Sequence, residues 1–241
     1  METSIKRRAL LLAMAAAAVV PPAFAQSKSM KIGVIGSGRI GSTIGGLWAK
    51  AGHEVMFSDR DPEQVKRAIE GLGPELKSKA RAGSVAEAAA FGDAILIAVP
   101  YAALPAIQQQ VGAQLKGKVV IDPNNPVPSR DGELGAQARE KGAGISTAAL
   151  LPGARIARAF NSWGYGVMAR EANRPAPRMA IPVAADDATA LKVGMQLVAD
   201  AGFDPVAAGS LAASKAFDLG SSVSGRVLTA PEMRQALQLK P

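Results

Sequence analysis

The sequence predicts an α/β protein in which a doubly wound, mostly parallel β-sheet is covered by helices on both faces. Short apolar runs that suit buried strands alternate along the chain with segments of helical periodicity. The clearest unit lies within residues 30–60, where a strand, a glycine-rich turn, a helix and a second strand follow one another. Residues 94–99 form a continuous apolar run, as a strand buried on both faces requires. We therefore expect a single domain over residues 30–218.

The individual elements follow from apolar periodicity and from the residues that start and stop helices. Strands are expected over residues 31–35, 55–57, 79–82, 94–99, 118–121, 155–160 and 179–184. Helices are expected over residues 40–51, 61–72, 85–90 and 102–111, and between Asp187 and Gly202. Residues 219–241 are expected to form a Gly/Ser-rich linker and a short helix that begins with a capping box at Thr229–Glu232.

Three glycines follow the first strand at the spacing G-x-G-x-x-G, namely Gly36, Gly38 and Gly41. In a dinucleotide site the first permits a tight turn, the second lets the backbone approach a pyrophosphate, and the third lets the helix pack closely on the sheet. The helix N-terminus adds free N–H groups and a partial positive charge. The position of the motif between a strand and an amphipathic helix favours a Rossmann-type nicotinamide dinucleotide site over an empty turn. The other expected loop contacts are Ser37, Arg39 and Ile40.

The residues after the second strand should distinguish NADP from NAD, and they point in opposite directions. Asp59 suits the ribose hydroxyls of NAD, because a carboxylate accepts their hydrogen bonds and repels a 2′-phosphate. Arg60 suits the 2′-phosphate of NADP, with Ser58 and Ser37 as hydroxyl donors. The alternative for Arg60 is a solvated surface charge. From these residues alone, NADP and NAD are equally favoured.

Ligands of doubly wound sheets bind beyond the carboxyl ends of the strands. We therefore expect Val99 and Pro100 beside a ribose, and Asn125 and Asn161 near the nicotinamide ring. Turn formation is an equal alternative for Asn125 and the better explanation for Asn124, because asparagine and proline both favour turns.

Composition excludes several classes of site. The chain has no cysteine and one histidine, His53, so thiolate chemistry is absent and a histidine metal site or catalytic triad is hard to build. The formal net charge of +8 is spread along the chain, and aromatic residues make up only 4% of it. This pattern does not indicate a nucleic-acid surface, and a basic nucleotide-binding protein explains it. We expect no metal and no nucleic-acid partner.

The first 25 residues have the three parts of a signal peptide. A basic region at Lys6–Arg8 precedes an apolar stretch over residues 9–20 and an Ala-x-Ala cleavage sequence that ends at Ala25. The stretch is too short to span a bilayer, so no stable membrane anchor is expected. Arg7 and Arg8 resemble a twin-arginine export signal, while an ordinary secretory signal and a translation start at Met30 are the alternatives. The expected location is the periplasm or the exterior.

Over residues 30–217 the sequence resembles the 8-hydroxy-5-deazaflavin-dependent NADP oxidoreductase family, including its bacterial NADP-binding members. The resemblance rests on residues 31–41, 51–55, 98–100, 120–126, 158–161 and 201–206. The first three segments also occur in pyrroline-5-carboxylate reductases and hydroxyacid dehydrogenases, whereas the last three are more particular to this family. Those other families need an additional helical domain, for which the remaining chain is too short.

The resemblance implies hydride transfer between a bound nicotinamide and a second planar redox carrier, a reaction that needs no acid–base pair. It implies NADP as the coenzyme, with Ser37 and Arg60 as phosphate contacts, although Asp59 departs from the family's usual small polar residue. The family's longer apolar C-terminus is replaced here by the Gly/Ser-rich residues 220–225.

We therefore expect an exported NADP-dependent oxidoreductase that transfers hydride to or from a flavin-like, deazaflavin or other small redox acceptor. One alternative is a reductase of a small imine or carbonyl substrate, with Tyr101 or Ser162 as proton donor. Another is a nucleotide-binding sensor without turnover, because fold alone does not fix function. The expected partners are the dinucleotide and the redox substrate, and the sequence is compatible with a homodimer.

Overall fold

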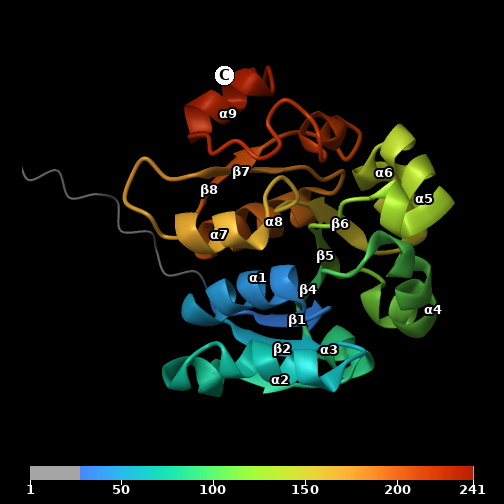
Figure 1. Ribbon diagram of the computed structural model, residues 1–241, viewed down its shortest axis with the longest axis vertical. Helices are drawn as coiled ribbons and strands as arrows, with labels where there is room; N and C mark the ends of the chain where they lie inside the picture. Colours follow the sequence, from blue (N-terminus) through green and yellow to red (C-terminus); the bar gives the residue numbers. More distant parts are fainter. Residues whose placement is uncertain (1–27, 241) are drawn as a thin grey trace, which may run out of the picture.

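The computed structural model describes residues 28–240, so the expected signal peptide at residues 1–25 lies outside the described residues. The strands are β1 (Lys31–Ile35), β2 (Glu54–Ser58), β3 (Ala80–Ala82), β4 (Ala94–Ile97), β5 (Val119–Asp122), β6 (Arg155–Arg158), β7 (Ala180–Val183) and β8 (Asp204–Ala207). The first six form one parallel sheet in the order β3-β2-β1-β4-β5-β6. This doubly wound topology confirms the predicted fold class (Figure 1).

The helices are α1 (Arg39–Lys50), α2 (Pro62–Glu70), α3 (Val85–Phe91), α4 (Leu104–Leu115), α5 (Pro128–Lys141), α6 (Ala143–Leu150), α7 (Tyr165–Glu171), α8 (Ala188–Asp200) and α9 (Ala230–Ala236). Short 3₁₀ helices occupy Pro74–Lys79, Tyr101–Ala103 and Ala213–Phe217. Within residues 28–240, no helix is long and apolar enough to cross a membrane.

Both faces of the main sheet are buried, which explains why its strands read as continuous apolar runs. In β1, Ile32 and Val34 face the core beneath α1, α2 and α8, whereas Ile35 faces the core beneath α3 and α4. The same alternation continues in β4, where Leu96 and Ile97 point to opposite faces.

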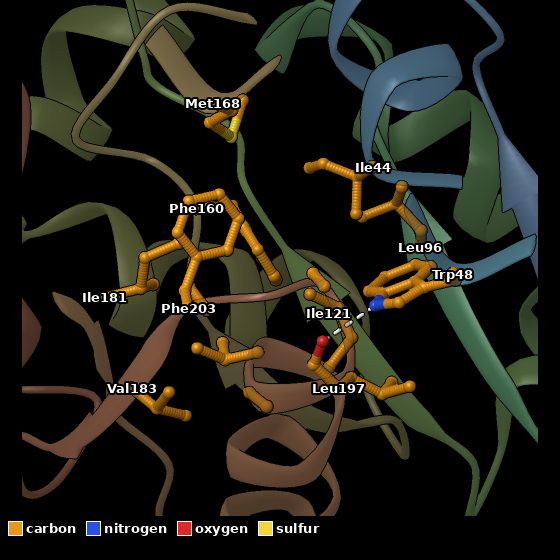
Figure 2. Packing of buried hydrophobic residues seen from close by; sticks show 14 of the residues in the cluster. Ile44, Trp48, Leu96, Ile121, Phe160, Met168, Ile181, Val183, Leu197 and Phe203 are labelled. Atoms are coloured by element: carbon orange, nitrogen blue, oxygen red, sulfur yellow. Dashed lines mark hydrogen bonds between the residues drawn. The ribbon is translucent and has the colours of Figure 1, made fainter. Parts of the chain in front are cut away.

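A second, two-stranded parallel sheet of β7 and β8 extends the fold beyond β6. It is attached through an antiparallel bridge between Arg158 and Ala184. The aromatic side chains of Trp48, Phe160 and Phe203 pack edge to face in the core between the two sheets, and the Trp48 indole donates a hydrogen bond of 2.7 Å to the carbonyl oxygen of Leu197 (Figure 2). These contacts join α1, β6 and α8 into one core.

The C-terminal residues 219–240 pack on this second sheet rather than hanging from the domain as a linker. Val223 and Met233 are fully buried, and the carbonyl oxygen of Leu228 accepts a hydrogen bond from the β7 residue Ala180. The expected helix is present as α9, with both hydrogen bonds of its capping box in place, and it covers β7 and β8 (Figure 1). Buried apolar residues between the glycines and serines explain why this segment is ordered.

Two groups of elements differ from the sequence-based expectation. Strands β4 and β6 end at Ile97 and Arg158, two residues earlier than expected, and Phe160 has a φ of 63°, which no extended strand accommodates. Helices α5, α6 and α7 and strand β8 were not predicted. Weak periodicity explains the omission of α5, because Gly132 with a φ of 60° divides it and most of its residues are polar.

Candidate functional site

Two adjoining cavities lie along the carboxyl ends of the parallel strands, one of about 610 Å³ and the other of about 370 Å³. They share the lining residues Gly38, Ala98, Val99 and Pro100, so together they form one groove. The first cavity is bordered by the end of β2 and by α4, and the second by the loop after β5 and by the end of β6. The groove therefore has the position expected of a dinucleotide site.

Each of the three glycines in the motif is explained by a different feature of the structure. Gly36 has a φ of 96°, and a Cβ atom there would overlap the carbonyl oxygen of Ala98. A Cβ atom on Gly41 would overlap the carbonyl oxygen of Gly36, because α1 packs closely on the loop. Gly38, in contrast, has no described atom within 4 Å of such a Cβ and lines both cavities. The protein itself does not require a glycine at this position, but a ligand lying against the loop would require one.

The N-terminus of α1 opens into the groove without a protein cap. Gly38 is its N-cap residue, no side chain caps the helix, and its first turn contains no acidic residue. The unpaired N–H groups and the positive end of the helix dipole are thus directed at the groove, an arrangement that binds phosphate. Arg39 is exposed and lies over the ring of Tyr165 at 5.2 Å, whereas Ile40 is half-buried and contacts the core.

Ser58 at the end of β2 and Ser37 in the glycine loop do not have their expected role as phosphate contacts, whereas the charged residues after β2 lie at the groove. Ser58 is fully buried, and its hydroxyl donates to the carbonyl oxygen of Val34 at 2.8 Å. The Ser37 hydroxyl is also buried and donates to the backbone carbonyl oxygen of Ser58 at 3.0 Å. Both hydroxyls thus hold the loop against the sheet. Asp59 and Arg60 line the first cavity.

Asp59 links the end of β2 to the glycine loop. One carboxylate oxygen accepts the N–H of Ser37 at 2.8 Å, and the other accepts the N–H of Asp61 at 3.1 Å. Arg60 is exposed and makes no hydrogen bond or ion pair with any residue in the described part of the chain. The carboxylate is therefore held in place, and the guanidinium is free to meet a ligand phosphate.

At the other end of the groove, Asn125 lines the second cavity and Asn161 lies behind it. The Asn125 amide donates to the carbonyl oxygen of Asn161 at 2.6 Å. Asn161 is only 2% exposed, its amide donates to the carbonyl oxygen of Phe217 at 2.9 Å, and it does not line the cavity. Val99 and Pro100 lie where the two cavities meet, as expected for residues beside a ribose.

Sequence reasoning missed a buried charge cluster beneath this end of the groove. Arg158, with no exposed surface, donates to Asp122 at 2.9 Å, to Asp218 at 2.6 Å and to the carbonyl oxygen of Asn124 at 2.8 Å. Asp122 is also buried and accepts the N–H of Asn124 at 2.9 Å. The signal was present in the sequence, because charged residues inside otherwise apolar strand runs must be paired.

A second ion pair, between Arg130 and Asp131, borders the second cavity. Arg130 lines it, donates to the carbonyl oxygen of Asn125 at 2.9 Å and makes two hydrogen bonds to Asp131. Burial acts to raise the pKa of Asp131, but hydrogen bonds from Arg130 and from the N–H groups of Val127 and Ala102 outweigh it and the pKa is lowered. Asp131 therefore stays ionised and fixes the loop after β5.

The two residues considered as proton donors lie away from the groove. Tyr101 is fully buried, its hydroxyl lies 3.3 Å from that of Thr147, and burial raises its pKa to about 12. The Ser162 hydroxyl is buried and donates to the carbonyl oxygen of Phe217 at 3.0 Å. Neither residue lines either cavity, so the geometry gives no support to an imine or carbonyl reductase that uses them.

The fold and the groove define a Rossmann-type dinucleotide-binding protein. Residues 31–126 match the model of the family described as NADP oxidoreductase, coenzyme F420-dependent. The F420-dependent NADP reductase of Methanothermobacter thermautotrophicus is 32% identical over 178 residues, which cover 70% of this chain and 75% of that protein. The chain therefore belongs to the coenzyme F420-dependent NADP oxidoreductase family, as the sequence resemblance indicated.

Other similarities are more distant. The glycerol-3-phosphate dehydrogenase [NAD(P)+] of Ectopseudomonas mendocina is 28% identical over 138 residues, and the match spans 53% of this chain but only 40% of that protein. A hypothetical protein from Sinorhizobium meliloti has a similar fold, with a TM-score of 0.68 at 23% identity over 86% of this chain and 98% of that one. The family, the reductase and the dehydrogenase all carry NADP or NAD(P) in their descriptions, and the family supports NADP as the coenzyme.

Proposed function

We propose that this protein is an NADP-dependent oxidoreductase that transfers hydride between the nicotinamide ring and a planar, flavin-like or deazaflavin acceptor. One observation carries the proposal: a cavity lined by Trp163 and Phe160 adjoins the glycine-loop cavity and shares Gly38, Ala98, Val99 and Pro100 with it. Two planar rings can thus meet at the junction. The F420-dependent relative supports a deazaflavin as the first acceptor to test.

The space beside Gly38 and the uncapped α1 N-terminus support the fit of these residues to the coenzyme. NADPH supplies the hydride when it is bound. The α1 N-terminus would hold its pyrophosphate, Asp59 and Arg60 its adenosine ribose and 2′-phosphate, and Asn125 its nicotinamide end.

The second cavity suits a reaction without acid–base catalysis. None of the described residues that line it is a histidine, an aspartate or a glutamate. Hydride transfer between two rings requires contact, orientation and exclusion of water rather than a proton donor. The contribution of this chain is therefore to hold the rings in register.

Steady-state oxidation of NADPH in the presence of separate acceptors tests the proposal. The panel comprises an 8-hydroxy-5-deazaflavin, FMN, a quinone, a ferric chelate and a cyclic imine. We expect turnover with the deazaflavin or FMN. Turnover with the imine alone would identify a reductase of small substrates, and NADPH binding without turnover would identify a sensor.

Coenzyme choice depends on the two charged residues at the end of β2. Replacing Asp59 by serine removes a fixed negative charge beside the expected 2′-phosphate, so NADPH should bind about tenfold more tightly, and NADH should not gain. Arg60→Ala should lower the NADPH preference by a similar factor. Calorimetric titration of each variant with both coenzymes gives the ratio, and an unchanged ratio in Arg60→Ala would remove Arg60 from the phosphate site.

We further propose that residues 1–25 direct export, with twin-arginine translocation as the route, on the strength of the basic, apolar and cleavage regions in the sequence. The mass of the protein recovered from the periplasm should correspond to a chain that begins at Gln26. A full-length chain retained in the cytosol would contradict this proposal.

A further inference from the structure

We propose that Arg158 and Asp218 are positioning residues that fix the side-chain amide of Asn125 at the nicotinamide end of the groove. The inference rests on the proposed function, because it takes the second cavity as the place of the nicotinamide ring. It concerns residues that lie outside the groove and act on the ligand through Asn125 alone.

The oxygen of the Asn125 amide is held by Arg158. The Nη2 atom of Arg158 lies 3.4 Å from Asn125 Oδ1, and the same Nη2 donates to Asp218 Oδ1 at 2.6 Å. Arg158 Nε donates to the same carboxylate oxygen at 3.0 Å. These two hydrogen bonds to Asp218, together with those of Nη1 to Asp122 and to the carbonyl oxygen of Asn124, fix the rotation of the planar guanidinium and so the direction of the Nη2 N–H that faces Asn125.

The nitrogen of the Asn125 amide is held from the opposite side. It donates to the carbonyl oxygen of Asn161 at 2.6 Å, and the Asn161 side chain in turn donates to the carbonyl oxygen of Phe217 at 2.9 Å. Phe217 and Asp218 are adjacent in the chain. The amide oxygen is therefore connected through Arg158 to Asp218, and the amide nitrogen is connected through Asn161 to Phe217. Both connections end just before the C-terminal segment.

This arrangement permits only one orientation of the amide. Rotating it by half a turn would place its N–H₂ group against the Arg158 donor and its oxygen against the Asn161 carbonyl. An amide nitrogen carries two hydrogens, and Asn161 accepts one of them. Because Asn125 lines the second cavity, the other N–H would be a fixed donor for the carboxamide oxygen of a bound nicotinamide.

Asp218 is the better residue to change. Its side chain is 17% exposed, and Arg158 keeps its buried partner Asp122 when Asp218 is neutralised. Asp218→Asn should therefore fold. The four proteins of a double-mutant cycle are the wild type, Asp218→Asn, Asn125→Ala and the double variant. Each is titrated calorimetrically with NADPH and with 2′-phospho-ADP-ribose, which lacks the nicotinamide.

We expect Asp218→Asn to weaken NADPH binding about tenfold and to leave 2′-phospho-ADP-ribose binding unchanged. In the Asn125→Ala background, Asp218→Asn should produce no further loss of NADPH affinity, although it should still lower the melting temperature. Glu54→Gln is the matched control, because it neutralises the partner of Arg81 in an exposed ion pair of 2.9 Å away from the groove, and both affinities should stay unchanged.

The outcomes separate this inference from the proposed function. Failure of the wild type to bind NADPH would overturn the proposed function. If the wild type binds NADPH but Asp218→Asn lowers the NADPH affinity equally in the wild-type and Asn125→Ala backgrounds, the inference alone is overturned. Asp218 would then act independently of Asn125. Equal losses for NADPH and for 2′-phospho-ADP-ribose would likewise overturn it, because the effect would then be general to the fold.

Discussion

Gly38→Val is expected to lower the affinity for NADPH at least a hundredfold while leaving the free energy of unfolding almost unchanged. The position has a φ of −65° and a ψ of −169°, which a valine adopts without strain, and no described atom lies within 4 Å of a Cβ atom there. The side chain would instead occupy the space through which a pyrophosphate reaches the α1 N-terminus. A loss of that size corresponds to about 2.7 kcal/mol of binding energy.

Gly166→Val is the matched control for this experiment. Gly166 also has open space around its Cβ position, but it lies in the first turn of α7 and lines neither cavity of the groove. NADPH binding, measured by calorimetry or by nicotinamide fluorescence, should be normal. If Gly38→Val binds NADPH like the wild type, the coenzyme does not lie against the glycine loop and the proposed site is wrong.

Arg158→Met is expected to reduce the free energy of unfolding at neutral pH by about 3–5 kcal/mol. The variant keeps most of the side-chain volume but removes the only described cation that pairs with Asp122, whose side chain is 1% exposed. A buried carboxylate without a counter-charge is far more costly than the intact pair is stabilising. Urea unfolding monitored by circular dichroism gives the difference.

Arg155→Met on the same strand provides the comparison. Arg155 pairs with Asp187 at 3.9 Å, and both side chains are more than 40% exposed. Such a surface pair contributes less than about 1 kcal/mol, so its loss should be small. Equal destabilisation by the two substitutions would show that burial of the Arg158 cluster does not determine its importance.

Most of the parallel sheet could be predicted because its strands are buried on both faces and separated by clear helix signals. Strands β1, β2, β4 and β5 contain apolar runs, and a glycine, a proline or a capping residue follows each of them within three residues. Helices α5 and α6 lack that signal, since Gly132 interrupts one and the apolar residues of the other are mostly small. Strand β8 contains a proline at its second position, which lowers its strand signal.

The candidate site could be predicted where local backbone geometry defines it, and less well where distant contacts do. Of the predicted residues, those that line the groove are Gly36, Gly38, Arg39, Ile40, Asp59, Arg60, Val99, Pro100 and Asn125. Ser37 and Gly41 belong to the same loop but line neither cavity. Ser58 and Asn161 occupy the expected strand ends, but their side chains turn into the protein, and alternation along a strand that ends in an irregular turn could not reveal this. The pairing of Arg158 with Asp218 spans 60 residues, and no sequence spacing indicates it.

The chain has two tryptophans, and their placement makes its intrinsic emission a report on two separate events. Trp48 is sealed in the core between the sheets, so the wavelength of its emission maximum should shift only with global unfolding. Trp163 borders the second cavity, where energy transfer to a reduced nicotinamide would quench it. A Trp48→Phe protein would thus record occupancy of the groove, and a Trp163→Phe protein would record denaturation, without any added dye.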